Sequence, residues 1–464
     1  MSPVAGEALA SPLGAFLPAQ RWFAGRGRRV ASVRVGPPVP LDPGPPALVH
    51  VLADVVYADG AVERYQVPVG VGAAPPAGLA ADRVIGRVAD DLVAWDALAD
   101  QRLTRVLLER MVAGADLAGL HFTVESHAAA LLVGVDLGAA RPLGAEQSNT
   151  SVVIDGRLIL KVFRLLVAGV NPELELTEAL AKHGFDAVAQ PVGWVEHAGE
   201  RPADPPTLAI LQPFYAGSAE GWALAVERST AWHDGDDGAG FGAEAYGLGQ
   251  VTGRLHAALA TALPTARPGP AEAAALAERR RDELAETVQL APELAELLPA
   301  VRALLGSATP GDAPLQRIHG DYHLGQVLGI LDGGPAVARW LILDFEGEPA
   351  RSLAQRRRPD SPLRDVAGML RSFDYAAFQP LVAGGELVSD TAGERAAAWA
   401  HQAREAFLAG WQAAGGSGAT NSLRTFELDK ALYEVRYEAR YRPSWLPVPL
   451  GGIRRLLAAS PTPR

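Results

Sequence analysis

The sequence contains no cysteine, which excludes disulfide bonds, thiolate catalysis and cysteine-ligated zinc. It also has no excess of basic residues: the formal net charge is −11, whereas a nucleic-acid-binding protein normally carries a basic face. No apolar run reaches the roughly 18 residues that a membrane span requires. The first residues lack the charged and apolar regions of a secretory signal. We therefore expect a cytoplasmic enzyme that binds neither nucleic acid nor a membrane.

The length of 464 residues and the hydrophobic content of 48 % predict two or three domains with well-buried cores. Alternating apolar residues predict strands at Val30–Val35, Ala47–Tyr57 and Val62–Val69, followed by a helix at Asp91–Met111. We place a small β-rich subdomain at 1–90, a mixed α/β lobe at 91–214 and a helical lobe at 215–464.

Further strands are expected in the middle lobe, at Ala128–Val135, on both sides of the turn Asp155-Gly156, and at Val188–Val195 and Thr207–Gln212. The last lobe shows apolar positions at three- and four-residue spacing, which predicts the helices Ala243–Ala260, Pro270–Leu305, Leu363–Phe378, Gly393–Ala414 and Ser422–Tyr441.

The segment 317–349 interrupts this helical pattern with two motifs, H-G-D-Y-H-L-G-Q and D-F-E-G-E-P. In the first, Asp321 is followed five residues later by Gln326, as in the kinase frame H-R-D-x-x-x-x-N, where the Asp accepts the substrate hydroxyl proton and the amide binds magnesium. In the second, an apolar strand delivers Asp344, with Glu346 as another hard oxygen ligand. The pair of motifs predicts a phosphoryl-transfer centre, in which His319 braces the loop by hydrogen bonding rather than acting as a base.

Nucleotide-binding residues are expected in the middle lobe. Lys161 alternates with Ile159 and Phe163 on one face of an apolar strand, where an unpaired ammonium group would be costly, so it is expected to face phosphates and a carboxylate. Its carboxylate partner is expected at the start of the helix after Asn171-Pro172; we choose Glu175, with Glu173 and Glu178 as alternatives. Phosphate contacts are predicted for Gln147, Ser148, Asn149, Thr150 and Ser151, and adenine contacts around Gln212 and Phe214.

These motifs resemble those of the aminoglycoside-phosphotransferase branch of the protein-kinase-like fold and, more closely, the actinobacterial maltokinases. The resemblance covers nearly the whole chain: P-A-Q-R-W-F-A-G-R at 18–26, G-A-E-Q-S-N-T-S at 144–151, H-G-D-Y-H-L-G-Q at 319–326, D-F-E-G-E-P at 344–349, S-P-L-R-D-V-A-G-M-L-R-S-F-D-Y-A at 361–376 and Y-E-V-R-Y-E-A-R-Y-R-P-S-W-L-P at 433–447. It implies an α+β, bilobal protein-kinase-like fold with an N-terminal β-rich cap subdomain, a mixed N-lobe and a mostly helical C-lobe.

The resemblance also implies an activity. It predicts phosphorylation of maltose at the anomeric hydroxyl by ATP, with Mg²⁺, to give maltose 1-phosphate and ADP for α-glucan (glycogen) synthesis from trehalose. A trehalose synthase partner is compatible with it. Bacterial glucosamine kinases share the architecture, but their motif tends to read D-F-D-G-N-P, which favours maltose here. The alternatives are a kinase for another small sugar or amino sugar, such as glucosamine, or an aminoglycoside-type phosphotransferase.

The acceptor sugar is expected on the helical lobe, because sugars bind to planar hydrogen-bonding side chains and aromatic faces. The candidate residues come from two stretches: Asp365, Arg371, Tyr375, Tyr433, Tyr437, Glu438, Arg440 and Trp445. Tyr433 and Tyr437 are four residues apart and would share one helix face. Two alternatives to sugar binding stay open. The stretch from Tyr433 to Trp445 belongs to a packing helix, and Asp365 holds the catalytic loop.

Overall fold

The structure is a computed structural model, which describes residues 4–144, 149–198, 205–267, 269–307, 314–334, 336–349, 351–384, 390–417 and 420–458. The chain forms two compact units, one made of Met1–Glu178 with Ala189–Ala216 and the other of Ala179–Val188 with Gly217–Arg464. In the described residues, none of the helices has the length and apolarity needed to cross a membrane.

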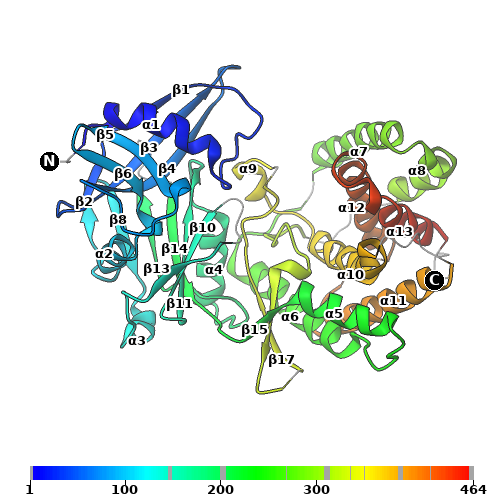
Figure 1. Ribbon diagram of the computed structural model, residues 1–464. Helices are drawn as coiled ribbons and strands as arrows, with labels where there is room; N and C mark the ends of the chain where they lie inside the picture. The colour runs from blue at the N-terminus through cyan, green and yellow to red at the C-terminus, as the bar shows by residue number, and fades with distance from the viewer. Residues whose placement is uncertain are drawn as a thin grey trace. The chain divides into compact units, whose positions relative to one another are not determined.

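The first unit begins with a strongly twisted antiparallel sheet in the order β1-β3-β4-β6-β5, to which β2 and β12 add at β3 and β4. Its strands are β1 (Val30–Val35), β2 (Val39–Asp42), β3 (Ala47–Tyr57), β4 (Val62–Gly72), β5 (Val84–Ala89), β6 (Leu92–Asp96) and β12 (Leu165–Leu166). Helix α1 (Gly6–Ala19) packs along β1 and β5 (Figure 1).

Alternate residues of β3 enter two different cores, because successive side chains of a strand point to opposite faces. Val49 and Val51 pack with α1 in one core. Leu48 and Leu52 belong to a second core, which the sheet shares with α2 (Gln101–Val112) and with the second sheet of this unit. This burial on both faces explains why β3 is apolar along nearly its whole length.

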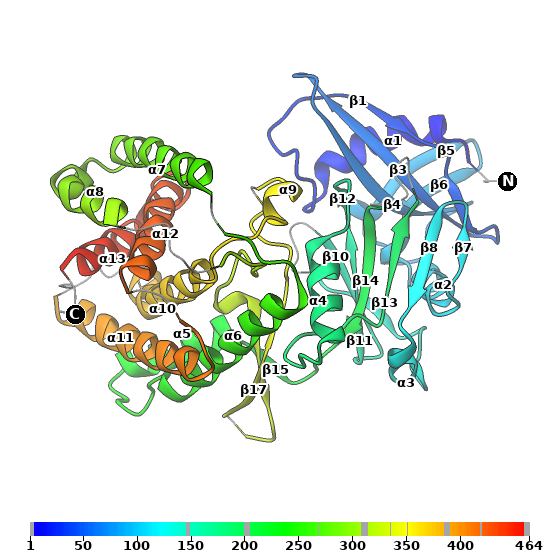
Figure 2. The same ribbon diagram turned by 180° about the vertical axis from the view of Figure 1, so that it is seen from behind.

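The second sheet of the first unit has the order β7-β8-β13-β14-β11-β10-β9, and its strands lie side by side in Figure 2. Its strands are β7 (Asp116–Leu117), β8 (Leu120–Val124), β9 (Ala140–Pro142), β10 (Asn149–Ile154), β11 (Leu158–Phe163), β13 (Gly193–His197) and β14 (Thr207–Pro213). Near it lie the short helix α3 (Ala129–Leu132) and the longer helix α4 (Pro172–Lys182). The last turn of α4 belongs to the second unit.

The second unit is mostly helical. Its helices are α5 (Gly221–His233), α6 (Gly242–Ala262), α7 (Pro270–Leu290), α8 (Leu298–Ser307), α9 (Leu353–Arg356), α10 (Leu363–Ala383), α11 (Asp390–Ala413), α12 (Thr420–Tyr441) and α13 (Pro447–Ala458). A three-stranded sheet, β15 (Ser218–Glu220), β16 (Val327–Leu331) and β17 (Val337–Ile342), carries the catalytic segment. Helix α12 packs on α10, α7, α8 and α13 (Figure 1).

The structure corrects three of the predicted elements. Residues 128–135, expected as a strand, form a 3₁₀ turn and α3. The expected helix Asp91–Met111 is the strand β6 followed by α2, which begins after Asp100 because this side chain accepts a hydrogen bond from the backbone of Arg102. The expected helix Pro270–Leu305 is divided into α7 and α8 by a 3₁₀ segment that starts at Pro292.

The aromatic and basic residues of the motif at 18–26 serve packing in this structure. Trp22 and Phe23 are buried against Tyr65, below α1. The guanidinium group of Arg26 donates to the backbone oxygen atoms of Gln20 and Arg21, at the end of α1. The motif therefore fastens α1 to the first sheet.

Candidate active site

The loop that carries Asp321 is held by a fixed histidine. The Nε2 atom of His319 lies 2.8 Å from the backbone oxygen of Leu343, and its Nδ1 accepts a hydrogen bond from the backbone of Asp321. Because Nδ1 accepts, the proton of the neutral ring is on Nε2, where it is donated to Leu343. The ring is buried and touches Phe345. His319 thus joins the two motifs, as expected, and both of its nitrogen atoms are already bonded.

Asp365 anchors the same loop from α10. Its two carboxylate oxygen atoms accept hydrogen bonds of 2.9 Å from the backbone amides of His319 and Gly320. His256 on α6 adds a contact of 3.3 Å. Burial raises the pKa of this carboxyl group, but the bonds from His256 and the loop outweigh burial and hold the pKa below its usual range. With an exposed fraction of 1 %, Asp365 cannot contact a sugar, so its assignment to the acceptor site was wrong and the alternative role holds.

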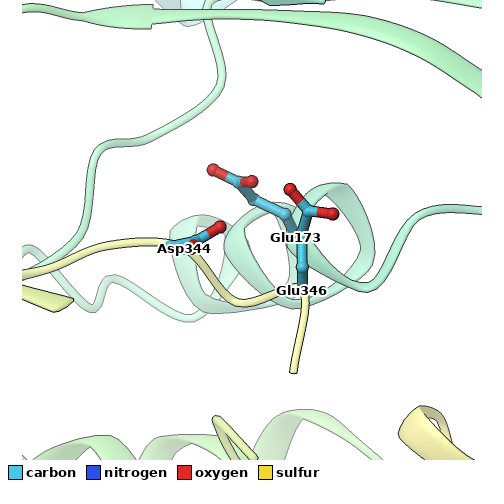
Figure 3. A group of neighbouring side chains, drawn as sticks. All are labelled: Glu173, Asp344 and Glu346. Atoms are coloured by element: carbon cyan, nitrogen blue, oxygen red, sulfur yellow. The ribbon is translucent and has the colours of Figure 1, made fainter. Parts of the chain in front are cut away.

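The second motif begins where β17 ends. Asp344 has a φ of +59°, in the left-handed region that costs a non-glycine residue on the order of 1 kcal/mol and is typical of functional loops. The amide nitrogen of Gln326 donates to Asp344 Oδ2 over 3.1 Å, so the structure brings these two predicted metal ligands together. Figure 3 shows the carboxylates of Asp344 and Glu346 on one short loop, and Glu173 on α4.

The predicted ligands Gln326, Asp344 and Glu346 fit a hard divalent cation. Asp344 and Glu346 offer carboxylate oxygen atoms and Gln326 an amide oxygen, which are the donors that magnesium prefers. The backbone oxygen of Glu346 accepts a hydrogen bond of 2.9 Å from Arg356 on α9, which fixes the end of the loop. The loop can therefore present several oxygen ligands from a backbone that is held at both ends.

Lys161 of β11 forms an ion pair with Glu173 rather than with the expected Glu175. Lys161 Nζ lies 2.6 Å from Glu173 Oε2, and both side chains are largely buried. Asn171 accepts a hydrogen bond from the backbone of Glu173 and so fixes the first turn of α4. Because consecutive helical residues are about 100° apart, Glu175 points roughly 200° away from Glu173. The choice of Glu175 as the partner was therefore wrong, although the existence of a carboxylate partner was correct.

The other residues assigned to the nucleotide lie in the second sheet of the first unit. Gln147 and Ser148 fall outside the described residues. Asn149, Thr150 and Ser151 start β10, where Ser151 is paired with Lys161 in the sheet. The hydroxyl of Thr150 accepts a hydrogen bond of 2.8 Å from Arg164, and the buried side chain of Gln212 donates to Ala189. The backbone amide of Phe214 donates to Arg157.

A cavity of about 480 Å³ opens in the second unit, lined by residues of α7, α12, the start of α10 and the segment 348–351 at the end of the second motif. Its lining includes Tyr433, Tyr437 and Arg440, three of the residues assigned to the acceptor. The tyrosine rings are partly exposed, at 44 % and 41 % of their surface. Exposed aromatic faces next to charged groups are suited to a sugar, whose rings have apolar faces and polar edges.

The remaining residues assigned to the acceptor do not line this cavity. Arg371 is fully buried and pairs with Asp374 and with Glu434 of α12, at 2.5 and 2.7 Å. These carboxylates outweigh the effect of burial, which alone would lower the pKa of Arg371, and hold the guanidinium group in its charged form. Arg371 therefore supports α12 and was wrongly assigned to the sugar.

Tyr375, Glu438 and Trp445 form a second supporting group. The hydroxyl of Tyr375 donates to Glu438 over 3.0 Å, and its ring stacks on Trp445 at 5.5 Å. Glu438, with an exposed fraction of 1 %, also accepts hydrogen bonds from Arg442. Glu438 is thus buried in this group, and its assignment to the sugar is corrected; Tyr375 and Trp445 are only partly buried, and their assignment stays a prediction.

The sequence analysis missed Lys430 and Glu348. Lys430 Nζ lies 3.9 Å from Asp321 Oδ1 and 3.4 Å from Glu348 Oε1, and both Lys430 and Glu348 line the cavity. A signal existed in the composition: of the 42 basic residues only Lys161, Lys182 and Lys430 are lysines. A chain that otherwise uses arginine keeps a lysine at position 430, beside Asp321 and Glu348, where a compact ammonium group differs from a guanidinium group.

Comparisons with known proteins agree with this arrangement. Residues 139–426 match the model of the phosphotransferase enzyme family, and residues 16–100 match the maltokinase N-terminal cap domain. The chain therefore belongs to the phosphotransferase enzyme family. It is 31 % identical over 337 residues to a glucosamine kinase of Mycolicibacterium smegmatis, with 68 % of this chain and 79 % of the relative covered.

A second relative, a glucosamine kinase of Streptacidiphilus jiangxiensis, is 29 % identical over 350 residues, with coverages of 69 % and 75 %. Among solved structures, a glucosamine kinase in complex with glucosamine, ADP and inorganic phosphate has a TM-score of 0.70 at 23 % identity, with coverages of 98 % and 100 %. This likeness confirms the predicted fold: a kinase-like phosphotransferase with a β-rich N-terminal cap. The relatives are named glucosamine kinases, whereas the sequence motifs predict maltose as the acceptor.

Proposed function

We propose that this phosphotransferase transfers the γ-phosphoryl group of ATP to a hydroxyl group of a small sugar. The observation that carries the proposal is the position of Asp321, which lies 3.9 Å from Lys430, a residue that lines the 480 Å³ cavity. The loop that carries Asp321 is bonded to Leu343 through His319 and to Asp344 through Gln326. Such a loop can present a base and metal ligands together, next to a space large enough for a sugar.

In the proposed mechanism Asp321 accepts the proton of the sugar hydroxyl and orients its oxygen for attack. Gln326, Asp344 and Glu346 would hold magnesium, which neutralises phosphate charge when it is bound. Lys161, held by Glu173, is the group that we assign to the nucleotide phosphates. His319 and Asp365 fix the loop, so that little reorganisation is needed during transfer.

Glucosamine is the acceptor that the named relatives favour. Both curated relatives are glucosamine kinases, and each is aligned over about two thirds of this chain. An amino sugar acceptor was the alternative expectation from the sequence, and the relatives support it better than they support maltose.

Maltose is the second candidate, and the charges of the cavity favour it. The carboxylates in the lining are Glu283, Glu348 and Asp429, and each is bonded to a basic side chain. An ammonium group on the sugar would therefore compete with these basic side chains for the carboxylates of the described lining, which suits a neutral acceptor. The maltokinase cap match adds to this case. A role in glycogen synthesis and a trehalose synthase partner follow only if maltose is the acceptor.

An acceptor panel tests the proposal. The purified chain is incubated with ATP, magnesium and glucosamine, maltose, glucose or an aminoglycoside, and ADP release is coupled to NADH oxidation. Phosphorus NMR of the product identifies the phosphorylated oxygen. Asp321→Asn serves as the blank and should lose more than 99 % of the turnover. Turnover with one sugar selects it; turnover with aminoglycosides alone, or wild-type rates in the blank, would refute the proposal.

A further inference from the structure

Lys430 is the basic residue of α12 that lies next to the Asp321 carboxylate. Its ammonium group lies between two carboxylates, 3.4 Å from Glu348 Oε1 and 3.9 Å from Asp321 Oδ1. It also lies 5.2 Å from the centre of the Tyr433 ring, on the cavity side of the helix. Burial lowers the pKa of Lys430, but Glu348 and Asp321 outweigh burial and raise it, so the side chain stays protonated at neutral pH.

The loop 319–326, which carries the base, contains no lysine or arginine. Between Asp321 and Gln326 the chain reads Y-H-L-G, and the ring of His323 accepts a hydrogen bond from Gly325. Burial lowers the pKa of His323, which keeps this ring neutral. In the described part of the chain, Lys430 is the one basic side chain with a nitrogen within 4 Å of the Asp321 carboxylate.

We propose that Lys430 is the positioning residue of the base: its ammonium group fixes the Asp321 carboxylate toward the cavity, and Glu348 holds Lys430 in place. The inference rests on the proposed function of the site. It also explains the third acidic residue of the D-F-E-G-E-P motif, because Glu348 lies four residues after Asp344 and contacts Lys430 in the lining of the cavity.

The step that Lys430 supports is a simple exchange of bonds. The sugar O–H bond breaks as its proton passes to Asp321, and the sugar oxygen forms a bond to the γ-phosphorus. The bond from that phosphorus to the β,γ-bridging oxygen breaks, and ADP leaves with the electron pair. Lys430 stays protonated throughout and acts by holding the orientation of the Asp321 carboxylate, since a small displacement of a catalytic group costs about 100-fold in rate.

Glu348 is well placed to hold Lys430. It also forms an ion pair of 2.6 Å with Arg351. Glu348 therefore remains anchored to Arg351 when Lys430 is changed. This arrangement allows the two residues to be tested separately.

The test compares Lys430→Met with Lys430→Arg, and uses Lys182→Met, at an exposed position, as the matched control. We expect Lys430→Met to lower kcat about 100-fold with the KM for ATP and the KM for the sugar within about threefold of wild type. Lys430→Arg should recover at least about tenfold of this loss, because the charge returns in a larger group. Lys182→Met should behave as wild type, and thermal unfolding verifies that all variants are folded.

Glu348→Gln completes the test as a double-variant cycle. If Glu348 acts through Lys430, its change should lower kcat about fivefold in the wild-type background and less than twofold in the Lys430→Met background. Additive effects would overturn the role of Glu348. A kcat of Lys430→Met within twofold of wild type, or a rise in the sugar KM alone, would overturn the role of Lys430.

A failure of the proposed function can be told apart from a failure of this inference. If no sugar in the panel is phosphorylated, the same variants are compared in the slow hydrolysis of ATP, where water takes the place of the sugar hydroxyl. Asp321 has to orient water as well, so Lys430→Met should still reduce this rate at least tenfold if the inference is correct. An unchanged hydrolysis rate would refute it.

Discussion

Asp365 offers the sharpest test of how the catalytic loop is held. Its carboxylate accepts hydrogen bonds from the amides of His319 and Gly320, one to each oxygen, and a further contact from His256. In Asp365→Asn one oxygen becomes an NH₂ group, which cannot accept. Whichever way the amide is turned, it faces at least one backbone N–H with a second donor.

The magnitude follows from these contacts. A hydrogen bond to a charged group contributes about 1.5–3 kcal/mol, and a buried donor without a partner adds to the loss. We therefore expect Asp365→Asn to destabilise the second unit by roughly 2–4 kcal/mol, which for a unit of this size lowers the Tm by about 5–10 °C. Because the loop carries Asp321, kcat should also fall about 100-fold.

The effect has a defined pH dependence. The pKa of Asp365 in the folded protein lies below its usual range, so its stabilisation is present above the unfolded value of about 4 and is lost as the pH falls through the lower folded value. The asparagine does not titrate. The difference in Tm between wild type and Asp365→Asn should therefore be constant at neutral pH and shrink below about pH 4.

Differential scanning fluorimetry from pH 8 down to about pH 2.5 and steady-state kinetics near neutral pH measure both effects. Asp332→Asn, in an exposed turn between β16 and β17, is the matched control and should change the Tm by less than about 2 °C. A Tm of Asp365→Asn equal to that of the control, with a normal kcat, would refute the reasoning that this carboxylate holds the loop.

Three further predictions follow from the site. Glu173→Gln should raise the KM for ATP about tenfold while Glu175→Gln leaves it within twofold, because Glu173 pairs with Lys161; equal effects would contradict this pairing. Asp344→Ala should abolish magnesium-dependent ATP binding in calorimetry, since it removes a charged ligand, and unchanged affinity would place the metal elsewhere. Tyr437→Ala should raise the sugar KM at least fivefold and leave the ATP KM unchanged, whereas movement of both constants together would assign Tyr437 a structural role.

The parts of the fold that follow from local pattern were predicted well. β1 and β3 have the expected bounds, and α6, α10, α11 and α12 begin within a few residues of the expected positions. The catalytic loop could be recognised because its chemistry depends on spacing within one short segment, and spacing is visible in a sequence. Ala128–Val135 was misjudged because a short apolar run has no period long enough to distinguish a strand from a turn of helix.

The misassigned and missed site residues have separate physical causes. Arg371 and Glu438 have the side chains of a sugar site, but whether a polar side chain faces a cavity or a partner depends on the helix that packs against it. The choice between Glu173 and Glu175 depends on the residue at which α4 begins. Two residues along a helix turn a side chain to nearly the opposite side, so a small error in this start selects the wrong glutamate. Lys430 was missed because it lies more than a hundred residues after Asp321 in the chain.

Helix α12 carries both buried charged residues and side chains that line the cavity. Glu427, Glu434 and Glu438 follow one side of the helix and pair with Arg404, Arg371 and Tyr375. Lys430, Tyr433 and Tyr437 follow another side and line the cavity.

Buried ion pairs add little net stability, but a buried charge that loses its partner costs about 3–5 kcal/mol. Any rotation or one-turn shift of α12 would separate Glu434 from Arg371 and Glu427 from Arg404 at once. The buried pairs therefore select a single register of α12 against α10 and α11. Because Lys430 is on the same rigid helix, this register also determines the distance between its ammonium group and Asp321.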